Sequence, residues 1–474
     1  MTDAPEPLVL RLGAPAHGGH VVARTDEGRV VFVRHGLPGE LVRVRLSDHE
    51  PDASFWRGDA VEVLEAASGR RAEHVWPEAD AVLAAAAGRA PLGGAEFGHA
   101  ELETQRGMKT AVVAEQLSHL AGVEWDGAVR PVAGETPDGT GWRTRLHLDV
   151  GADGTAGMYP HRSGELSTLG DMPLATDAIR ALAPWSRRYR GAERVDVAAP
   201  EGGTPLVHVN VRPDASDDDV AALRAELTEW GAEHGLGVTA HIPGRRETQV
   251  WTGAGELRET LALPGQDEFS WRVSPTGFWQ VHRRAPETLV SAVLDAAQFA
   301  PGDAVWDLYS GAGLFTAVAA RAVGEKGSVL AVEGSPVTSA DAAHNLADAP
   351  HVRTVRGDVA RVLTGRAPRG GQRRGRSRAA ASSRARNGQW GPRPGRPDVV
   401  VLDPPRAGAA KDVLGAVDHA DPRRIVYVAC DPAALGRDLG RLRRRGWRVD
   451  GVEAFDLYPN THHVEAVAAL SRDR

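Results

Sequence analysis

The feature that most constrains the fold is an alternation of apolar runs and helical stretches that begins near residue 271. Five runs have the length and composition of buried strands, and they cover residues 305–309, 329–333, 352–355, 399–402 and 425–429. Strands that alternate with helices form a parallel, doubly wound sheet. The sequence therefore predicts an α/β domain over residues 271–474, completed by a β element from residues 447–455 and 464–470.

Residues with useful chemistry stand where these runs end. They are Tyr309, Gly311, Gly313, Glu333, Asp358, Asp403 and Cys430. Doubly wound sheets bind ligands at the carboxyl ends of their strands, so this coincidence predicts one ligand site. The two glycines allow a turn to approach a ligand closely, and Glu333 is placed to accept hydrogen bonds from ribose hydroxyls. The pattern indicates an adenosine-containing cofactor.

The details of the glycine turn favour S-adenosylmethionine over a nicotinamide dinucleotide. A dinucleotide enzyme would carry a third glycine where Thr316 stands, and the turn holds no lysine for phosphates. A tight turn without any ligand remains the alternative. The later motif Asp403-Pro404-Pro405-Arg406 follows an apolar run, and its two prolines stiffen the turn and hold the Asp403 carboxylate over the pocket.

Cys430 is the only cysteine in the chain of 474 residues. A single cysteine excludes a disulfide framework and a four-thiolate metal site. Cys430 stands between a buried strand and a helix that Asp431 would cap and Pro432 would start. A thiol there lies near the positive end of the helix, which favours the thiolate. A buried structural cysteine is the alternative.

A second polar cluster, residues 456–465, precedes the last apolar run. Its final residue, Glu465, is flanked by Val464 and Ala466, and an apolar setting raises the pKa of a carboxyl group. Such a group suits a general base, whereas an exposed acid at a strand start is the alternative. Gln280 stands in a loop with aromatic residues. It either hydrogen-bonds the edge of a nucleobase or is part of a packed loop.

The N-terminal half predicts two further domains. Residues 8–64 contain five short strand-like runs separated by glycines, so we expect a small β-barrel over residues 1–68. Such barrels often bind single-stranded nucleic acid, although a plain β domain fits as well. Residues 69–270 mix helical and strand patterns and predict an α+β domain. Its cations Lys109, Arg143 and Arg145 are either RNA contacts or solvated charges.

Residues 365–397 form a low-complexity insertion with ten arginines and no acidic residue, in a chain of net charge −7. This composition cannot build a core and predicts disorder. The insertion is either an RNA-binding arm or a tolerated surface loop. No run approaches the about 20 apolar residues of a membrane span, and the polar N-terminus is no secretory signal. We therefore expect a cytoplasmic protein.

Together these motifs resemble the RNA uracil-C5 methyltransferase family, whose members use a cysteine nucleophile. The matching stretches are residues 32–33, 37–40, 157–174, 274–280, 307–313, 332–334, 403–406, 430–432, 437–439 and 461–465. The resemblance implies a C-terminal class I, Rossmann-like methyltransferase domain, an N-terminal TRAM β-barrel and a central RNA-binding domain. It also implies a monomer that acts on tRNA or 23S rRNA.

The resemblance also implies roles for individual residues. S-adenosylmethionine would be contacted by Gln280, Tyr309, Glu333 and Asp403, with Gly311 and Asp358 at the same strand ends. Cys430 would be the nucleophile and Glu465 the base. Some members hold an iron–sulfur cluster on four cysteines. His74 and Ala95 stand in the matching region here, so we expect no iron–sulfur cluster and no other metal.

The implied chemistry follows from the weakness of uracil carbon 5 as a nucleophile. Addition of the Cys430 thiolate to carbon 6 turns the ring into an enolate, and carbon 5 can then take a methyl group. Glu465 removes the proton from carbon 5. RNA cytosine-C5 enzymes typically use two cysteines, so the single cysteine favours uracil. The rival hypotheses are a methyltransferase-like RNA-binding protein without turnover and a nicotinamide-dependent dehydrogenase.

Overall fold

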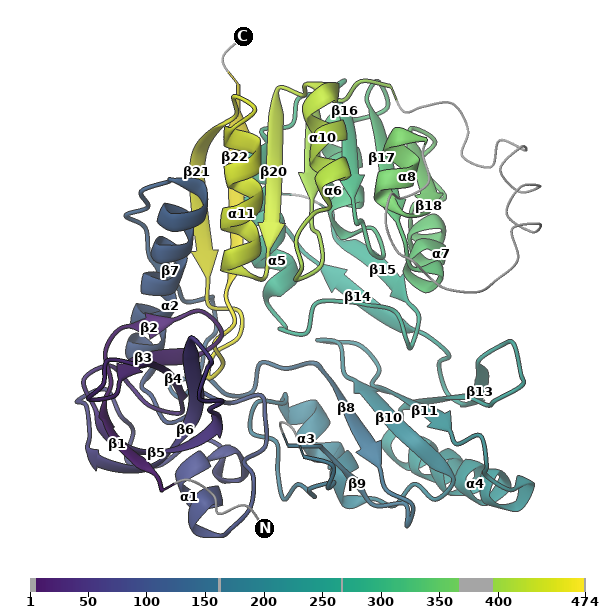
Figure 1. Ribbon diagram of the computed structural model, residues 1–474. Coiled ribbons are helices and arrows are strands. Elements are labelled where there is room, and N and C mark those ends of the chain that lie inside the picture. The colour runs from purple at the N-terminus through teal and green to yellow at the C-terminus, as the bar shows by residue number, and fades with distance from the viewer. Residues whose placement is uncertain (1–5, 161–162, 266, 366–394, 473–474) are drawn as a thin grey trace, which may run out of the picture.

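The computed structural model describes residues 6–160, 163–265, 267–365 and 395–472 (Figure 1). Nearly all of the predicted insertion, residues 366–394, lies outside the described residues, so its predicted disorder stays a prediction. In the described part of the chain, every helix is too short or too polar to cross a membrane.

The N-terminal unit is a six-stranded β-sheet that confirms the predicted small β domain. Its strands are β1 (Leu8–Arg11), β2 (Pro15–Ala16), β3 (His20–Arg24), β4 (Val30–Arg34), β5 (Leu41–Asp48) and β6 (Phe55–Glu65). Their order is β1-β5-β6-β4-β3-β2. Alternate side chains such as Val31, Val33, Val42 and Val44 are fully buried, which is the period of a half-buried strand. The two-residue strand β2 carries too short a signal to be predicted.

A second sheet lies in the central part of the chain, in the order β13-β12-β11-β10-β8-β9. Its strands are β8 (Arg145–Val150), β9 (Ala156–Gly157), β10 (Ala192–Ala198), β11 (Leu206–Val211), β12 (Gly237–His241) and β13 (Gln249–Thr252). Helix α4 (Asp217–His234) packs on it through Leu223, Leu227 and Trp230. The short helices nearby are η1 (Pro77–Ala79), α1 (Ala81–Ala86), α3 (Asp177–Leu182) and η3 (Pro184–Ser186).

The C-terminal unit is the predicted doubly wound sheet, in the order β18-β17-β16-β19-β20-β22-β21-β7. Five strands are parallel: β16 (Ala304–Leu308), β17 (Ser328–Glu333), β18 (Val352–Arg356), β19 (Val399–Leu402) and β20 (Arg424–Ala429). Antiparallel strand β22 (Glu465–Ser471) separates β20 from β21 (Arg448–Phe455).

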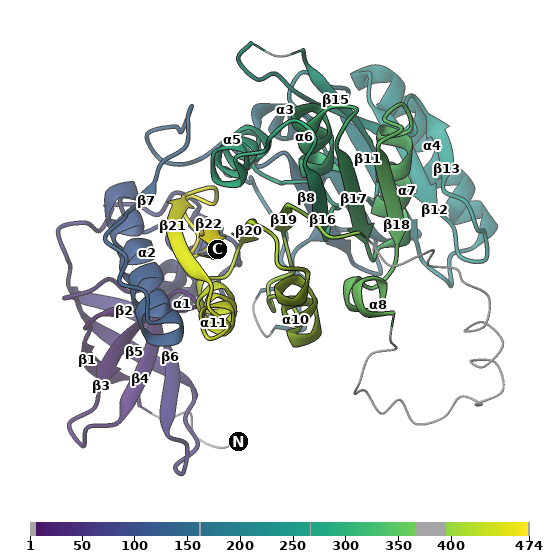
Figure 2. The same cartoon turned by 90° about the horizontal axis from the view of Figure 1, so that it is seen from above.

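Helices cover both faces of this sheet, as the view from above shows (Figure 2). One face carries α5 (Ala285–Ala297), α6 (Leu314–Val323) and α7 (Pro336–Asn345), and the other carries α8 (Val359–Thr364), α10 (Lys411–Ala420) and α11 (Pro432–Arg443). Two hydrophobic cores result, one on each face. Val401 belongs to one core and Leu402 to the other, which explains why these strands read as continuous apolar runs.

Parts of the predicted central domain join the C-terminal unit. Helix α2 (Leu102–Gln116) and the π-helical turn η2 (Leu117–Ala121) pack against α11, and β7 (Val129–Arg130) adds a strand beside β21. The hairpin of β14 (Leu257–Leu261) and β15 (Phe269–Val273) packs into the core under α5 and α6. The range 69–270 therefore contributes elements both to the central sheet and to the C-terminal unit.

Candidate functional site

The structure places Cys430 and Glu465 beside each other at the end of the sheet. Strands β20 and β22 pair antiparallel with Ala429 opposite Ala466, so the next position in this register sets Cys430 opposite Glu465. Directly after the thiol, Asp431 caps α11 through a 2.7 Å hydrogen bond that its Oδ1 accepts from the Ala434 amide. The predicted strand-to-helix transition at Cys430 is confirmed.

Cys430 lines a cavity of about 130 Å³ whose walls come from three parts of the chain. The N-terminal unit contributes the segment 15–19, and helix α2 contributes Met108 and Lys109. The remaining wall comes from Phe97, which precedes α2, and from the C-terminal unit, with Arg406, residues 430–432 and residues 462–464. The thiol is half-buried and lies at the wall of this cavity.

The pKa of the Cys430 thiol is higher than its place at the start of a helix predicts. Burial and the carboxylate of Glu465 raise the pKa of Cys430 to about 12. Asp403 adds to this effect, and the guanidinium of Arg406 opposes it. The prediction that the helix end favours the thiolate is thus wrong for the free protein, because carboxylates in a poorly solvated pocket outweigh a helix dipole.

Glu465 is buried, with 2% of its surface exposed. Burial and the charge of Asp403 raise its pKa well above the ordinary value, while a hydrogen bond from Tyr458 opposes them. Its Oε2 atom has no hydrogen-bond partner among the described residues. The predicted rise in pKa is confirmed, and the unpartnered oxygen is available to receive a proton.

The carboxylates at the ends of β16, β17 and β19 form a compact acidic group. Burial raises the pKa values of Asp307 and Asp403 to about 7 each. Glu333 accepts hydrogen bonds from the backbone amides of Gly311, at 2.9 Å, and Ser335, at 2.6 Å. Tyr309 and Gly311 both have positive φ, which turns the chain sharply over the strand ends.

Two other predicted cofactor residues, Asp358 and Gln280, have further contacts, and the charge of Asp358 also helps to raise the pKa of Tyr309. Asp358 is exposed and caps helix α8 by accepting a 2.9 Å hydrogen bond from the Arg361 amide. Gln280 is buried but lines a different cavity, of about 300 Å³, together with Thr144 and Glu259. Tyr309, Glu333 and Asp403 do not line the Cys430 cavity either, so the predicted contact of Gln280 with the cofactor stays a prediction.

The sequence assigned no role to Asp438, yet this residue holds the Asp-Pro-Pro-Arg loop in place. Its Oδ2 accepts hydrogen bonds from the Tyr427 hydroxyl, at 2.7 Å, and from the Ala409 amide, at 2.7 Å. Arg441 donates to Oδ1, also at 2.7 Å. A buried aspartate three times hydrogen-bonded fixes the loop that carries Asp403 and Arg406.

Helix α2 holds the segment before Glu465, which the sequence did not reveal. Lys109 is buried and pairs with buried Asp456 at 2.5 Å, so it is not a solvated charge. Gln105 accepts a hydrogen bond from the Asn460 amide at 2.7 Å. Polar residues at helical spacing, buried only because another part of the chain covers them, leave no pattern in the sequence.

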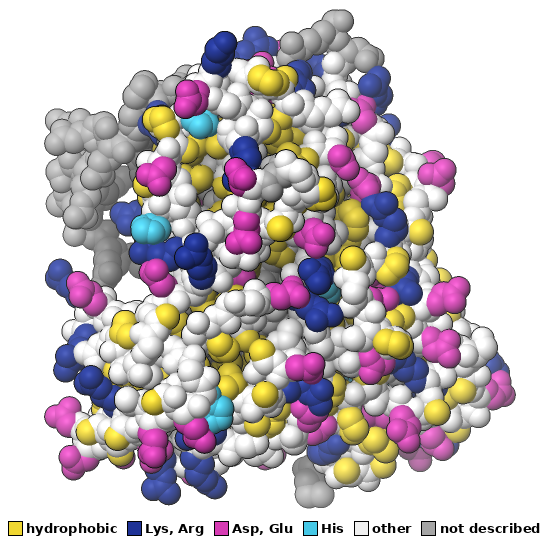
Figure 3. Space-filling model, turned by 180° about the vertical axis from the view of Figure 1, so that it is seen from behind, with side chains coloured by type: hydrophobic (Ala, Val, Ile, Leu, Met, Phe, Trp, Pro, Cys, Tyr) yellow, Lys and Arg dark blue, Asp and Glu magenta, His cyan; other side chains and the backbone are white. Residues whose placement is uncertain are grey.

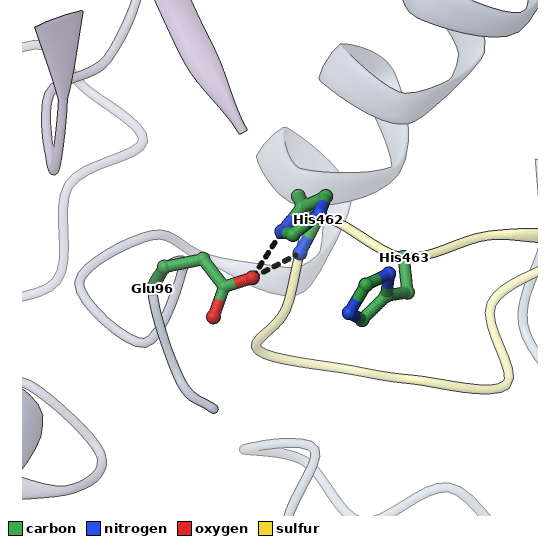
Figure 4. Close-up of side chains that lie close together, drawn as sticks. All are labelled: Glu96, His462 and His463. Atoms are coloured by element: carbon green, nitrogen blue, oxygen red, sulfur yellow. Dashed lines mark hydrogen bonds and ion pairs between the residues drawn. The ribbon is translucent and has the colours of Figure 1, made fainter. Parts of the chain in front are cut away.

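Glu96 makes a third link to this segment (Figure 4). Its carboxylate accepts hydrogen bonds from both the backbone amide and the ring Nδ1 of His462. With His463 these groups offer three ligand atoms within 4.8 Å of one another. However, the guanidinium of Arg406 lies 3.3 Å from His463 Nε2 and would repel a cation there. We interpret the cluster as a hydrogen-bonded bridge.

Models of known protein families match separate parts of the chain. The family model of tRNA (uracil-5-)-methyltransferase matches residues 396–473, and that of the TRAM domain matches residues 8–61. The model of protein-L-isoaspartate(D-aspartate) O-methyltransferase matches residues 272–369.

Relatives match over the full length. An uncharacterized RNA methyltransferase of Streptomyces avermitilis is 38% identical over 98% of each chain. The 23S rRNA (uracil(1939)-C(5))-methyltransferase RlmD of Alkalilimnicola ehrlichii is 30% identical over 99% of this chain and 97% of its own. The chain belongs to the RNA uracil-C5 methyltransferase family. This membership confirms the predicted resemblance, the methyltransferase activity and the dependence on S-adenosylmethionine.

The fold of this methyltransferase agrees with that of a solved structure. The tRNA (uracil-54, C5)-methyltransferase of Pyrococcus abyssi, solved with S-adenosyl-L-homocysteine, has a TM-score of 0.64, covering 98% of this chain and 99% of its own. At 16% identity this likeness shows the fold alone.

The strand ends of this methyltransferase fit a bound S-adenosylmethionine. Gly311 has open space where a side chain would stand. Buried Asp307 Oδ1 and Ser310 Oγ have no hydrogen-bond partner among the described residues. The acidic group favours a cationic sulfonium, whereas it would repel the phosphates of a dinucleotide.

Proposed function

We propose that this enzyme methylates carbon 5 of a uridine in structured tRNA or rRNA through a covalent adduct between Cys430 and carbon 6 of the ring. The supporting observation is the neighbourhood of Cys430 and Glu465 at the end of strands β20 and β22, where the charge of Glu465 acts on the thiol. A nucleophile and a base that act on one planar ring need such adjacent places.

In this proposal Cys430 and Glu465 carry out different steps of the reaction. The raised pKa keeps Cys430 as a thiol in the free protein, so the nucleophile forms only when the site is filled. S-adenosylmethionine supplies, when bound, an electrophilic methyl group and a positive charge. The Cys430 thiol gives up its proton to solvent as its sulfur bonds to carbon 6, and carbon 5 then takes the methyl group, so that S-adenosylhomocysteine leaves. Glu465 accepts the proton from carbon 5 as the bond between sulfur and carbon 6 breaks.

The target uridine must leave its stack to reach Cys430, because the thiol lies at the wall of a cavity of about 130 Å³ and not on an open surface. The relatives include an enzyme named for 23S rRNA and a solved structure named for tRNA. Both substrate classes therefore belong in the test.

The test is tritium release from RNA that carries 5-tritiated uridine. Cys430→Ala should release none, because no other cysteine can form the adduct, while RNA binding persists. Glu465→Gln should accumulate an RNA adduct that survives denaturing gels, because elimination then lacks its base. Glu193→Gln, at an exposed residue outside the Cys430 cavity, is the control. Formation of 5-methyluridine by Cys430→Ala would disprove the proposal.

We further propose that Tyr309, Gly311, Glu333 and Asp403 hold the methyl donor. Their support is their common place at the strand ends, where Glu333 is fixed by two backbone amides. Glu333→Gln should weaken the binding of S-adenosylhomocysteine in calorimetry, because an amide is a poorer acceptor for ribose hydroxyls. Glu226→Gln, at an exposed site on α4, should leave binding unchanged. Equal affinity of the Glu333 variant and the wild type would exclude this role.

A further inference from the structure

We propose that the N-terminal β-barrel supplies a positioning residue, His17, that holds the N-terminus of α11 and thereby the Cys430 thiol. This inference rests on the proposed role of Cys430 as the nucleophile. It gives the barrel a part in the catalytic centre itself, in addition to any part in binding RNA.

The contact that carries the proposal joins residues 414 positions apart. His17 Nε2 lies 2.8 Å from Asp431 Oδ2, and Asp431 Oδ1 accepts the 2.7 Å hydrogen bond from Ala434. Both oxygens of the carboxylate are therefore engaged, one by α11 and one by the barrel. The hydrogen bond to Asp431 also raises the pKa of His17, which favours a charge-assisted contact. Because Asp431 directly follows Cys430, fixing its carboxylate fixes the backbone that carries the thiol.

The loop that presents His17 is itself well held. Strands β2 and β3 pair with Pro15 opposite Val21 and Ala16 opposite His20. Gly18 and Gly19 close the turn with φ of 82° and 79°, which other residues rarely adopt. The paired strands and the tight turn present the imidazole, which is 40% exposed, to Asp431.

The loop that carries His17 also contacts the segment that precedes Glu465. A Cβ atom on Gly19 would lie 3.0 Å from the Cβ of His462, so the two backbones approach closely. His462 stands three residues before Glu465 and is held from the other side by Glu96. Residues 15–19 also line the cavity together with Cys430. The barrel thus closes one wall of the space that the target ring must enter.

A purely structural contact would have a different consequence from a positioning one. If His17 only docked the barrel, its loss would lower the stability of the protein or its affinity for RNA. It would not change the rate of methyl transfer once RNA and S-adenosylmethionine are saturating. The two cases are therefore separated by measuring the rate and the affinity independently.

The experiment compares His17→Ala with wild type in single-turnover methylation at saturating RNA, with RNA affinity measured by filter binding. The rate should fall roughly tenfold or more, because small displacements of a reacting group are costly, while the RNA affinity changes little. His17→Gln should restore much of the rate, since its amide can reach and donate to Asp431, whereas the shorter His17→Asn should not. His49→Ala, at an exposed residue of the same barrel, is the matched control.

A double-mutant cycle with Asp431→Asn tests whether the contact itself is responsible. The two substitutions should be non-additive in rate. A wild-type rate for His17→Ala, or a reduced rate without rescue by His17→Gln and without coupling to Asp431, would overturn the proposal. If His17→Ala fails to fold by circular dichroism, the difference between His17→Gln and His17→Asn decides. Cys430→Ala in the same assay reports separately on the proposed nucleophile, because its activity would refute that role whatever His17 does.

Discussion

The thiol of Cys430 meets two opposing influences. The N-terminus of α11 favours the thiolate, but burial and the carboxylates of Glu465 and Asp403 disfavour it more strongly. A thiol that stays protonated resists alkylation and oxidation. The same carboxylates have raised pKa values, which suits a site that must accept a cationic donor and a proton.

The protonation of this thiol is directly measurable, because the chain has no other cysteine. The rate of iodoacetamide alkylation follows the thiolate fraction, so it should be slow at neutral pH and still rise above pH about 9. Glu465→Gln should move the midpoint of this rise to lower pH, since it removes the charge that most raises the pKa after burial. Glu193→Gln should leave the midpoint in place. A rise centred at neutral pH in the wild type would contradict the raised pKa.

Among the elements, α11 connects the catalytic sheet to the N-terminal half. Its N-terminus carries the cap beside Cys430, and two of its glycines face the turn η2. A Cβ atom on Gly436 would lie 2.5 Å from the carbonyl oxygen of Gln116, and one on Gly440 would lie 2.3 Å from that of Leu120. The missing side chains thus allow two helical segments to pack backbone to backbone.

Gly440→Ala should therefore destabilise the protein by about 1–3 kcal/mol, the usual effect of overpacking a close contact. This is the opposite of the gain expected when alanine replaces glycine inside a helix. Gly415→Ala in α10 is the matched control, because its Cβ would meet only the end of the Arg445 side chain, at 3.8 Å. It should be neutral or stabilising by up to about 1 kcal/mol. Denaturant unfolding measures both, and equal stabilities would refute the close packing.

On the scale of the whole molecule, the N-terminal barrel lies beside the loops that follow β20 and precede β22 (Figure 1). The face shown in Figure 3 mixes cationic and acidic side chains and displays no broad basic patch. The insertion 365–397 carries ten arginines and no acidic residue. If the insertion is an RNA-binding arm, it should contribute a salt-dependent part of the affinity for RNA.

Deletion of residues 366–394 tests this role while keeping Arg396, which pairs with Asp421. The fold should persist, because the deletion lies between α8 and β19 and removes none of the residues that make up the described cores. An RNA-binding arm predicts a flatter dependence of log affinity on log salt, by roughly 0.7–0.9 for each lost phosphate contact. An unchanged slope in filter-binding titrations would show that the insertion does not contact RNA.

The sequence alone located the parallel strands of the C-terminal sheet and the chemically useful residues at their ends. Apolar runs with period and length of buried strands located β16 to β20, and residues such as Glu333, Asp403 and Cys430 were recognised at their ends. These signals are local, because a strand covered on both faces is apolar throughout and its terminus follows from the residues beside it. Family motifs then assigned the reaction.

Only the tertiary structure decided which groups share one pocket and what charge they carry. It raised the pKa of the Cys430 thiol against the expected shift, paired Lys109 with Asp456, and brought His17 to Asp431. These outcomes depend on strand register, burial and contacts between residues hundreds of positions apart. A pKa or a buried ion pair is set by all the charges and solvent around a group, and neighbours in sequence are a small part of that environment.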